Sequence, residues 1–145
     1  MKTLRRIRNQ RGAALLETAI TIPLILLVSV SIFEFGRAYQ TWQVLTNAAR
    51  EGARIAILPA TTDADVTAAV RSYMAGGQLP AAATASVTVE RTVPFGSTNT
   101  ASRITVAYPF NFTVLNPVIR LIQAGSTTGQ GTTTMSANAM MRNES

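Results

Sequence analysis

The first third of the chain follows the hydrophobic period of an α-helix. Residues 13–33 are predominantly apolar and contain a single charged side chain, Glu17. A helix of this length is about 31 Å long, which is enough to cross the hydrocarbon core of a bilayer. Because apolar residues lie on all sides of this helix, the pattern predicts a membrane-spanning segment rather than the core helix of a small domain.

Helical spacing of apolar residues continues beyond the apolar segment, but there the apolar residues lie on one side of the helix and polar residues lie on the other. The expected apolar stripe consists of Phe35, Ala38, Tyr39, Trp42, Leu45, Ala49, Gly52, Ala53 and Ala56. The sequence therefore predicts one helix that continues into an amphipathic stem and ends near Leu58, before Pro59. Tyr39 and Trp42 either pack on the rest of the domain or anchor in the lipid headgroup layer, and we expect packing.

A second helix is predicted from Asp63 to Met74. Thr62 and Asp65 have the spacing of a capping box, in which each side chain accepts a hydrogen bond from the backbone N–H of the other residue. Two glycines, at 76 and 77, are expected to end this helix.

Alternating apolar and polar residues predict strands in the C-terminal half of the chain. These strands are expected at residues 85–93, 103–108, 110–114 and 134–142, with a short helical piece at 118–123. The predicted fold class is α+β, with a long N-terminal transmembrane and amphipathic helix packed on a small antiparallel β-sheet head. The predicted division is a basic leader at 1–12, a transmembrane helix at 13–33, an amphipathic helical stem at 34–58 and a small α+β head at 59–145.

The positive charge of the chain is concentrated before the membrane segment. The net charge is +6, but five positive charges lie within the first twelve residues, at Lys2, Arg5, Arg6, Arg8 and Arg11. The remainder has eight basic and seven acidic residues. This asymmetry predicts a cytoplasmic N-terminus and a head on the other side of the membrane. It does not indicate nucleic-acid binding, because the body has no stripe of Arg and aromatic residues.

A secretory signal peptide also begins with positive charges and an apolar run. No small-x-small cleavage pattern follows the run in this chain, and the helical pattern continues through Glu34 and Arg37. We therefore expect the segment to remain part of the protein as a membrane anchor.

The composition argues against an enzyme. The chain contains no His and no Cys, so it lacks common catalytic groups, good transition-metal ligands and any means of forming a disulfide. Without His, no ordinary base activates its many Ser and Thr hydroxyls. We expect no catalytic residue, no metal and no cofactor. Arg50, Glu51 and Arg54 are interpreted as a solvated helix face.

Glu17 is the residue in the apolar segment that most needs an explanation. A carboxylate within a membrane helix costs a few kcal/mol and usually has a partner or a function. If the chain were cut between Gly12 and Ala13, the new α-amino group would lie one helical turn before Glu17 and could neutralise it. In the alternative interpretation, Glu17 lies near the membrane surface and reaches water.

Two stretches of the chain resemble a known family. A basic leader, then Gly12, Ala13 and a helix with Glu17 at its fifth position resemble the processing site of type IV pilins and pseudopilins. The stretches 32–39 (IFEFGRAY) and 47–54 (NAAREGAR) narrow this resemblance to the TadE-like pilus assembly proteins, minor pilins of the Tad (Flp, tight adherence) pilus. The resemblance covers about residues 10–56, with a weaker likeness at 137–142.

This resemblance implies a pilin-like fold and a function in pilus assembly. A membrane prepilin peptidase would cut after Gly12, and Glu17 would assist subunit packing. The implied partners are this peptidase, other Tad pilins or pseudopilins, the inner-membrane assembly platform and membrane lipid. The expected location is the inner membrane, as a single-pass protein with its head in the periplasm or outside the cell. The alternative is an uncut single-pass membrane protein whose head binds a partner or the cell wall.

The small residues of the stem have two interpretations. Ala49, Gly52 and Ala53 leave room for another backbone to approach closely. They form either a helix-packing seam against a neighbouring subunit or a contact under the chain's own sheet, and we favour the second.

Overall fold

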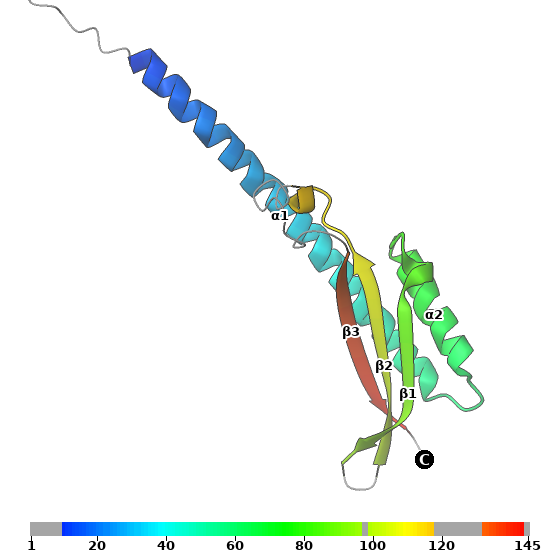
Figure 1. The fold of residues 1–145 in the computed structure, drawn as a ribbon. Coiled ribbons are helices and arrows are strands. Elements are labelled where there is room, and N and C mark those ends of the chain that lie inside the picture. The colour runs from blue at the N-terminus through cyan, green and yellow to red at the C-terminus, as the bar shows by residue number, and fades with distance from the viewer. Residues whose placement is uncertain (1–9, 97–98, 118–131, 144–145) are drawn as a thin grey trace, which may run out of the picture.

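A single helix, α1 (Gln10–Ala56), extends through 47 residues from the apolar segment into the head (Figure 1). The computed structural model describes residues 10–96, 99–117 and 132–143. At 1.5 Å per residue, α1 is about 70 Å long. Its first half projects from the head, and none of its most apolar window is buried within the chain. The predicted continuity of membrane segment and stem is confirmed, although the helix ends at Ala56.

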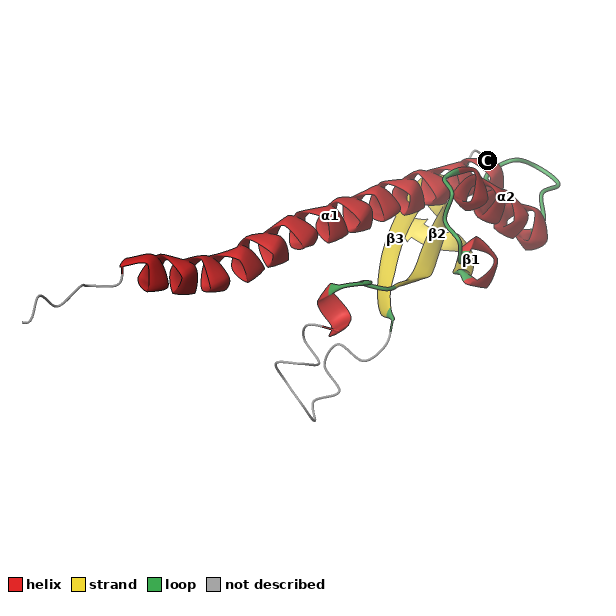
Figure 2. Cartoon of the chain, turned by 90° about the horizontal axis from the view of Figure 1, so that it is seen from above, coloured by secondary structure: helices red, strands yellow, loops and turns green. Residues whose placement is uncertain are grey.

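The head is a three-stranded antiparallel sheet with helices on one face (Figure 2). The strand order is β1-β2-β3, and both neighbouring pairs are antiparallel. The second half of α1 and the shorter α2 contribute to one core with the inner face of the sheet. The α+β fold class is therefore confirmed. The elements after α1 are α2 (Asp63–Gly76), η1 (Ala82–Thr84), β1 (Ser86–Phe95), β2 (Asn99–Phe110) and β3 (Thr133–Arg142).

The middle strand differs from the sequence-based prediction. Residues 103–108 and 110 belong to one strand, β2, which passes through Pro109, and residues 111–114 are not a strand. Pairing with β1 ends at Ala107, so Pro109 has a strand neighbour on one side only, where its missing N–H is tolerated. Residues 115–117 are helical. The helix expected at 118–123 lies outside the described residues.

The core forms where α1 lies against α2 and β2. Leu45, Ala49 and Ala53 of α1 are buried in one cluster with side chains of α2 and β2. Gly52 is the point of closest approach, because a Cβ atom there would lie 2.5 Å from Cγ2 of Val70 and 3.3 Å from Cγ2 of Ile104. Of the two interpretations of Ala49, Gly52 and Ala53, the structure supports packing within the chain. A neighbouring subunit cannot reach these residues in this fold.

The side of α1 that faces the head is rotated from the stripe expected at the start of the stem. Ala38, Thr41 and Leu45 face the head, whereas Tyr39 and Trp42 are exposed. The two exposed rings contact each other, with centroids 6.2 Å apart. The expectation that they pack on the domain is wrong, because the sheet covers the adjacent side of the helix.

An arginine of β1 caps the C-terminal end of α1. The Arg91 guanidinium donates to the carbonyl oxygens of Ala56 (2.8 Å) and Thr61 (2.9 Å), and it pairs with Asp63 at 2.7 Å. The strand register shifts between Glu90 and Val93, at the position of this side chain. A cation at a helix C-terminus is favoured by the helix dipole. Arg91 therefore joins the end of α1 to the start of α2.

The predicted capping box of α2 is confirmed. The Thr62 hydroxyl accepts from the Asp65 N–H (3.2 Å), and the Asp65 carboxylate accepts from the Thr62 N–H (2.9 Å). The Asp65 carboxylate also accepts from the Thr62 hydroxyl at 2.7 Å, and the hydrogen bonds that it accepts from the Thr62 backbone and hydroxyl lower the pKa of Asp65. At its other end, α2 ends at Gly76. The left-handed residue is Gln78 (φ 60°), while Gly77 allows close contact with Val44.

The close contact at Gly52 generates a stability prediction. In Gly52→Ala the new methyl group meets the stiff, branched side chain of Val70, so we expect the free energy of unfolding to fall by about 1–3 kcal/mol. Gly36→Ala is the matched control, because a Cβ atom there meets nothing within 4 Å. That variant should be neutral or more stable by about 0.5–1 kcal/mol. Denaturant unfolding of the full chain in detergent measures both, and equal stability of the two variants would contradict the packing described.

Candidate functional site: the membrane helix and its junction with the head

Both the apolar side chains and the hydroxyl groups in the first half of α1 are compatible with a lipid environment. Large apolar residues are exposed from Leu15 to Phe33. The hydroxyls in this segment donate to the carbonyl oxygen four residues earlier, as Thr18 does to Ala14 (2.8 Å) and Ser29 to Ile25 (2.8 Å). Because each such hydroxyl has a partner within the helix, it does not require water.

The sequence-predicted cleavage residues lie at the beginning of α1. Gly12 and Ala13 are exposed in its first turn, and Glu17 is exposed one turn later. Glycine is less favourable in a helix than alanine, so unwinding at Gly12 costs less than it would at an alanine. Ala13 and Glu17 have the i, i+4 spacing that places them on one face of the helix.

The structure adds a buried carboxylate that the sequence did not single out. Glu34 is 6% exposed, and its carboxylate pairs with Arg37 at 3.3 Å and accepts the N–H of Val114 at 3.3 Å. The spacing of Glu34 and Arg37 is visible in the sequence. The contact with Val114 joins residues eighty positions apart, and no local pattern indicates it.

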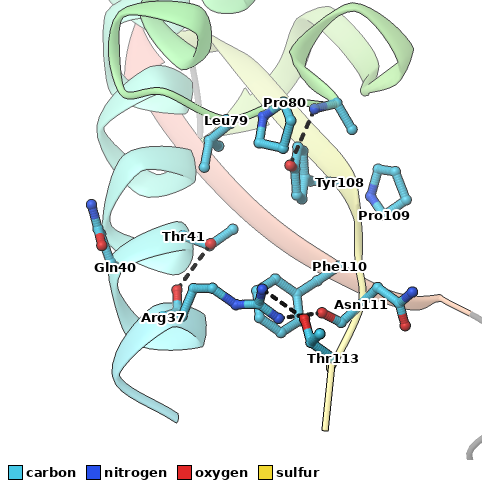
Figure 3. Close-up of a pocket in the computed structure, with 11 residues that line it drawn as sticks. Arg37, Gln40, Thr41, Leu79, Pro80, Tyr108, Pro109, Phe110, Asn111 and Thr113 are labelled. Carbon is cyan, nitrogen blue, oxygen red and sulfur yellow. Dashed lines mark hydrogen bonds between the residues drawn. The ribbon is translucent and has the colours of Figure 1, made fainter. Parts of the chain in front are cut away.

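Arg37 completes the attachment of the segment after β2 to the stem (Figure 3). Its guanidinium donates to the hydroxyl of Thr113 (3.0 Å) and to the carbonyl oxygen of Asn111, and it lies over the Phe110 ring at 5.1 Å from the centroid. Glu34 and Arg37 thus hold residues 110–114 against α1 at the end of the apolar segment. We call this arrangement the stem clamp.

A cleft of about 300 Å³ lies beside the stem clamp, between α1 and the end of β2. Among the described residues that line it, Arg37 is the one with a charge, and this charge is balanced by Glu34. The cleft is closed on one side by the Tyr108 hydroxyl, which accepts the N–H of Ala81 at 3.3 Å. The hydrogen bonds of Arg37 in this lining join α1 to the residues that follow β2. It is lined by Arg37, Gln40, Thr41, Leu79, Pro80, Ala81, Tyr108, Pro109, Phe110, Asn111 and Thr113.

The charged face near the C-terminal end of the stem is exposed, as the sequence predicted. Arg54 bonds Glu51 at 2.7 Å on the side of α1 away from the sheet, and this hydrogen bond lowers the pKa of Glu51. Arg50 is also exposed. These residues form a solvated helix face.

In comparison with known proteins, one family model matches the part of the chain that forms α1. The family model described as TadE-like protein matches residues 12–54. This confirms the resemblance over that segment, which begins at Gly12 and ends two residues before the end of α1. No curated protein and no solved structure matches the chain. Glu34 and Arg37 thus lie within the TadE-like segment, whereas residues 110–114, which they hold, lie outside it.

The stem clamp can be tested by removing its carboxylate. Glu34→Ala deprives Arg37 and the N–H of Val114 of a buried partner, so we expect a loss of about 1–3 kcal/mol in unfolding free energy. Chymotrypsin should also cut faster after Phe110 and Phe112 in this variant. Arg50→Ala, on the solvated face, is the control and should leave both readouts unchanged. Wild-type stability and cleavage in Glu34→Ala would show that the clamp does not hold this segment.

Proposed function

We propose that this chain is a membrane-anchored subunit of a Tad-type (Flp, tight adherence) pilus, a minor pilin or pseudopilin that acts in pilus assembly. The observation that carries the proposal is the coincidence of the TadE-like match with one continuous helix whose first half is apolar and exposed. Such a helix requires lipid or other helices around it, because exposed apolar surface of this extent is unfavourable in water.

Processing after Gly12 is the first element of the proposal. Gly12 and Ala13 are exposed in the first described turn of α1, where glycine lowers the cost of the local unwinding that a membrane prepilin peptidase requires. Cleavage removes the basic leader and leaves an α-amino group on Ala13. A cation at a helix N-terminus is unfavourable, and the carboxylate of Glu17 one turn away offsets it.

Assembly through the apolar half of α1 is the second element. Leu15, Leu16 and Ile20 are exposed around the helix near Glu17. When subunits gather, these side chains exchange contacts with lipid for contacts with neighbouring helices. Glu17 can then pair with the Ala13 amine of its own chain or of a neighbour. The proposed partners are other Tad pilins or pseudopilins and the inner-membrane assembly platform.

The proposed role is structural rather than catalytic. The chain has no His or Cys, and the described lining of the cleft at the stem clamp offers one charged side chain, already paired. We place the leader in the cytoplasm and the head in the periplasm or outside the cell, as the basic residues of the leader favour.

Cleavage provides the direct test. In cells that contain the prepilin peptidase, intact-mass measurement of the membrane-extracted protein should give a chain that starts at Ala13. Gly12→Arg should yield the full-length chain, because a bulky charged residue replaces the glycine before the cut. Peptidase-deficient cells provide the control. Uncut wild-type protein in peptidase-positive cells would contradict processing and leave an uncut single-pass protein with a partner- or wall-binding head.

A further inference from the structure

Apolar side chains gather at the end of the head that lies nearest the membrane segment. Phe33 and Phe35 of α1 are exposed, and Val114 is 40% exposed. The Phe35 and Phe112 rings meet edge to face, with centroids 6.2 Å apart. In Figure 1 the segment after β2 lies beside the middle of α1, and the β1–β2 hairpin lies at the opposite end of the sheet. We call Phe35, Phe112 and Val114 the membrane-side patch.

The helical rise places this patch at the edge of the bilayer. A hydrocarbon core about 30 Å thick is crossed by about 20 helical residues. If the core begins just after Glu17, it ends near Arg37, so Glu34 lies inside the boundary. The N–H of Val114 is 3.3 Å from the Glu34 carboxylate. With the core placed in this way, the neighbour of the patch would be lipid rather than water.

The polar groups at this depth are compensated. Glu34 is covered by the head and paired with Arg37, whose guanidinium also donates to Thr113 and Asn111. The sequence contains no charged residue between Arg103 and Arg120, a stretch that includes Phe112 and Val114. Among the residues that the structure describes at this end of the head, contact with lipid therefore leaves no unpaired charge in an apolar environment.

We propose that the membrane-side patch is immersed in the leaflet on the head's side, so that the head makes a second contact with lipid beside its anchor helix. Its occupant is lipid at the boundary between acyl chains and headgroups. Tyr39 and Trp42, about 3 and 8 Å beyond Arg37 along the helix, then lie in the headgroup layer, where aromatic rings are favoured. The proposal rests on the proposed function in requiring that the apolar half of α1 spans a membrane, and it places the hydrocarbon core between Glu17 and Arg37 rather than at residues 13–33.

Spin labelling tests this contact cleanly, because the chain has no Cys. Val114→Cys, Phe95→Cys and Ile25→Cys are each labelled in the otherwise unchanged full chain, which is then reconstituted in vesicles of phosphatidylethanolamine and phosphatidylglycerol. Phe95 is the matched control, since it is apolar, 44% exposed and at the opposite end of the sheet. Collisions with oxygen report lipid, and collisions with a water-soluble nickel complex report water.

The expected ratio of oxygen to nickel accessibility is several-fold higher at position 114 than at position 95. If positions 114 and 95 both gave the low ratio typical of water, while position 25 gave the high ratio typical of lipid, the lipid contact of the head would be overturned and the anchor would stand. An aqueous ratio at 25 would overturn the anchor and the docking together. A label at 114 that neither reagent reaches would show a protein cover, such as a second copy, and would also overturn the proposal.

The wild-type chain gives a second readout without substitution, because Trp42 is its one tryptophan. Lipids that carry a nitroxide on the headgroup should quench Trp42 fluorescence more strongly than lipids labelled deep in the acyl chain. Absence of quenching by either lipid would place Trp42 outside the membrane and contradict the proposed depth.

Discussion

The structure depends on one constraint, namely that the membrane segment and the core of the head belong to the same helix. Leu16 is exposed near the start of α1, whereas Leu45 and Ala49 of the same helix are fully buried under α2 and the sheet. Because the backbone hydrogen bonds continue between these regions, the head has no independent orientation relative to the anchor. A displacement or rotation of α1 in the membrane is thus transmitted to the sheet.

The stem clamp reinforces this constraint where the head begins. Glu34 and Arg37 hold residues 110–114 against α1 at one end of the half of this helix that packs in the head. Arg91 of β1 caps the other end of that half. The sheet is thereby attached to α1 at both ends of their contact, with the small residues around Gly52 between them. For a proposed pilus subunit, such rigid attachment means that packing of neighbouring α1 helices also sets the positions of the heads.

Features determined by nearby residues could be predicted from the sequence, and those determined by distant contacts could not. The continuous helix, the Thr62–Asp65 capping box and the exposed Arg54–Glu51 pair follow from spacings of three or four residues. The exposure of Tyr39 and Trp42 depends on which side of α1 the sheet covers. The apolar stripe of the stem contains both small and aromatic residues, so the sequence pattern did not decide which of them the sheet would cover. Likewise, the burial of Glu34 requires residues 110–114, which arrive from the far end of β2.

Hydrogen exchange of the full chain in lipid nanodiscs tests the central constraint most directly. If α1 is one rigid helix, amides of residues 33–44 should exchange slowly, at rates close to those of the buried residues 45–53. Gly36 is exposed, a Cβ atom there would meet nothing within 4 Å, and glycine is a poor helix former, so a hinge would form most easily in this region. Exchange at residues 34–38 as fast as in an unstructured peptide would show that anchor and head move independently, which would contradict this account.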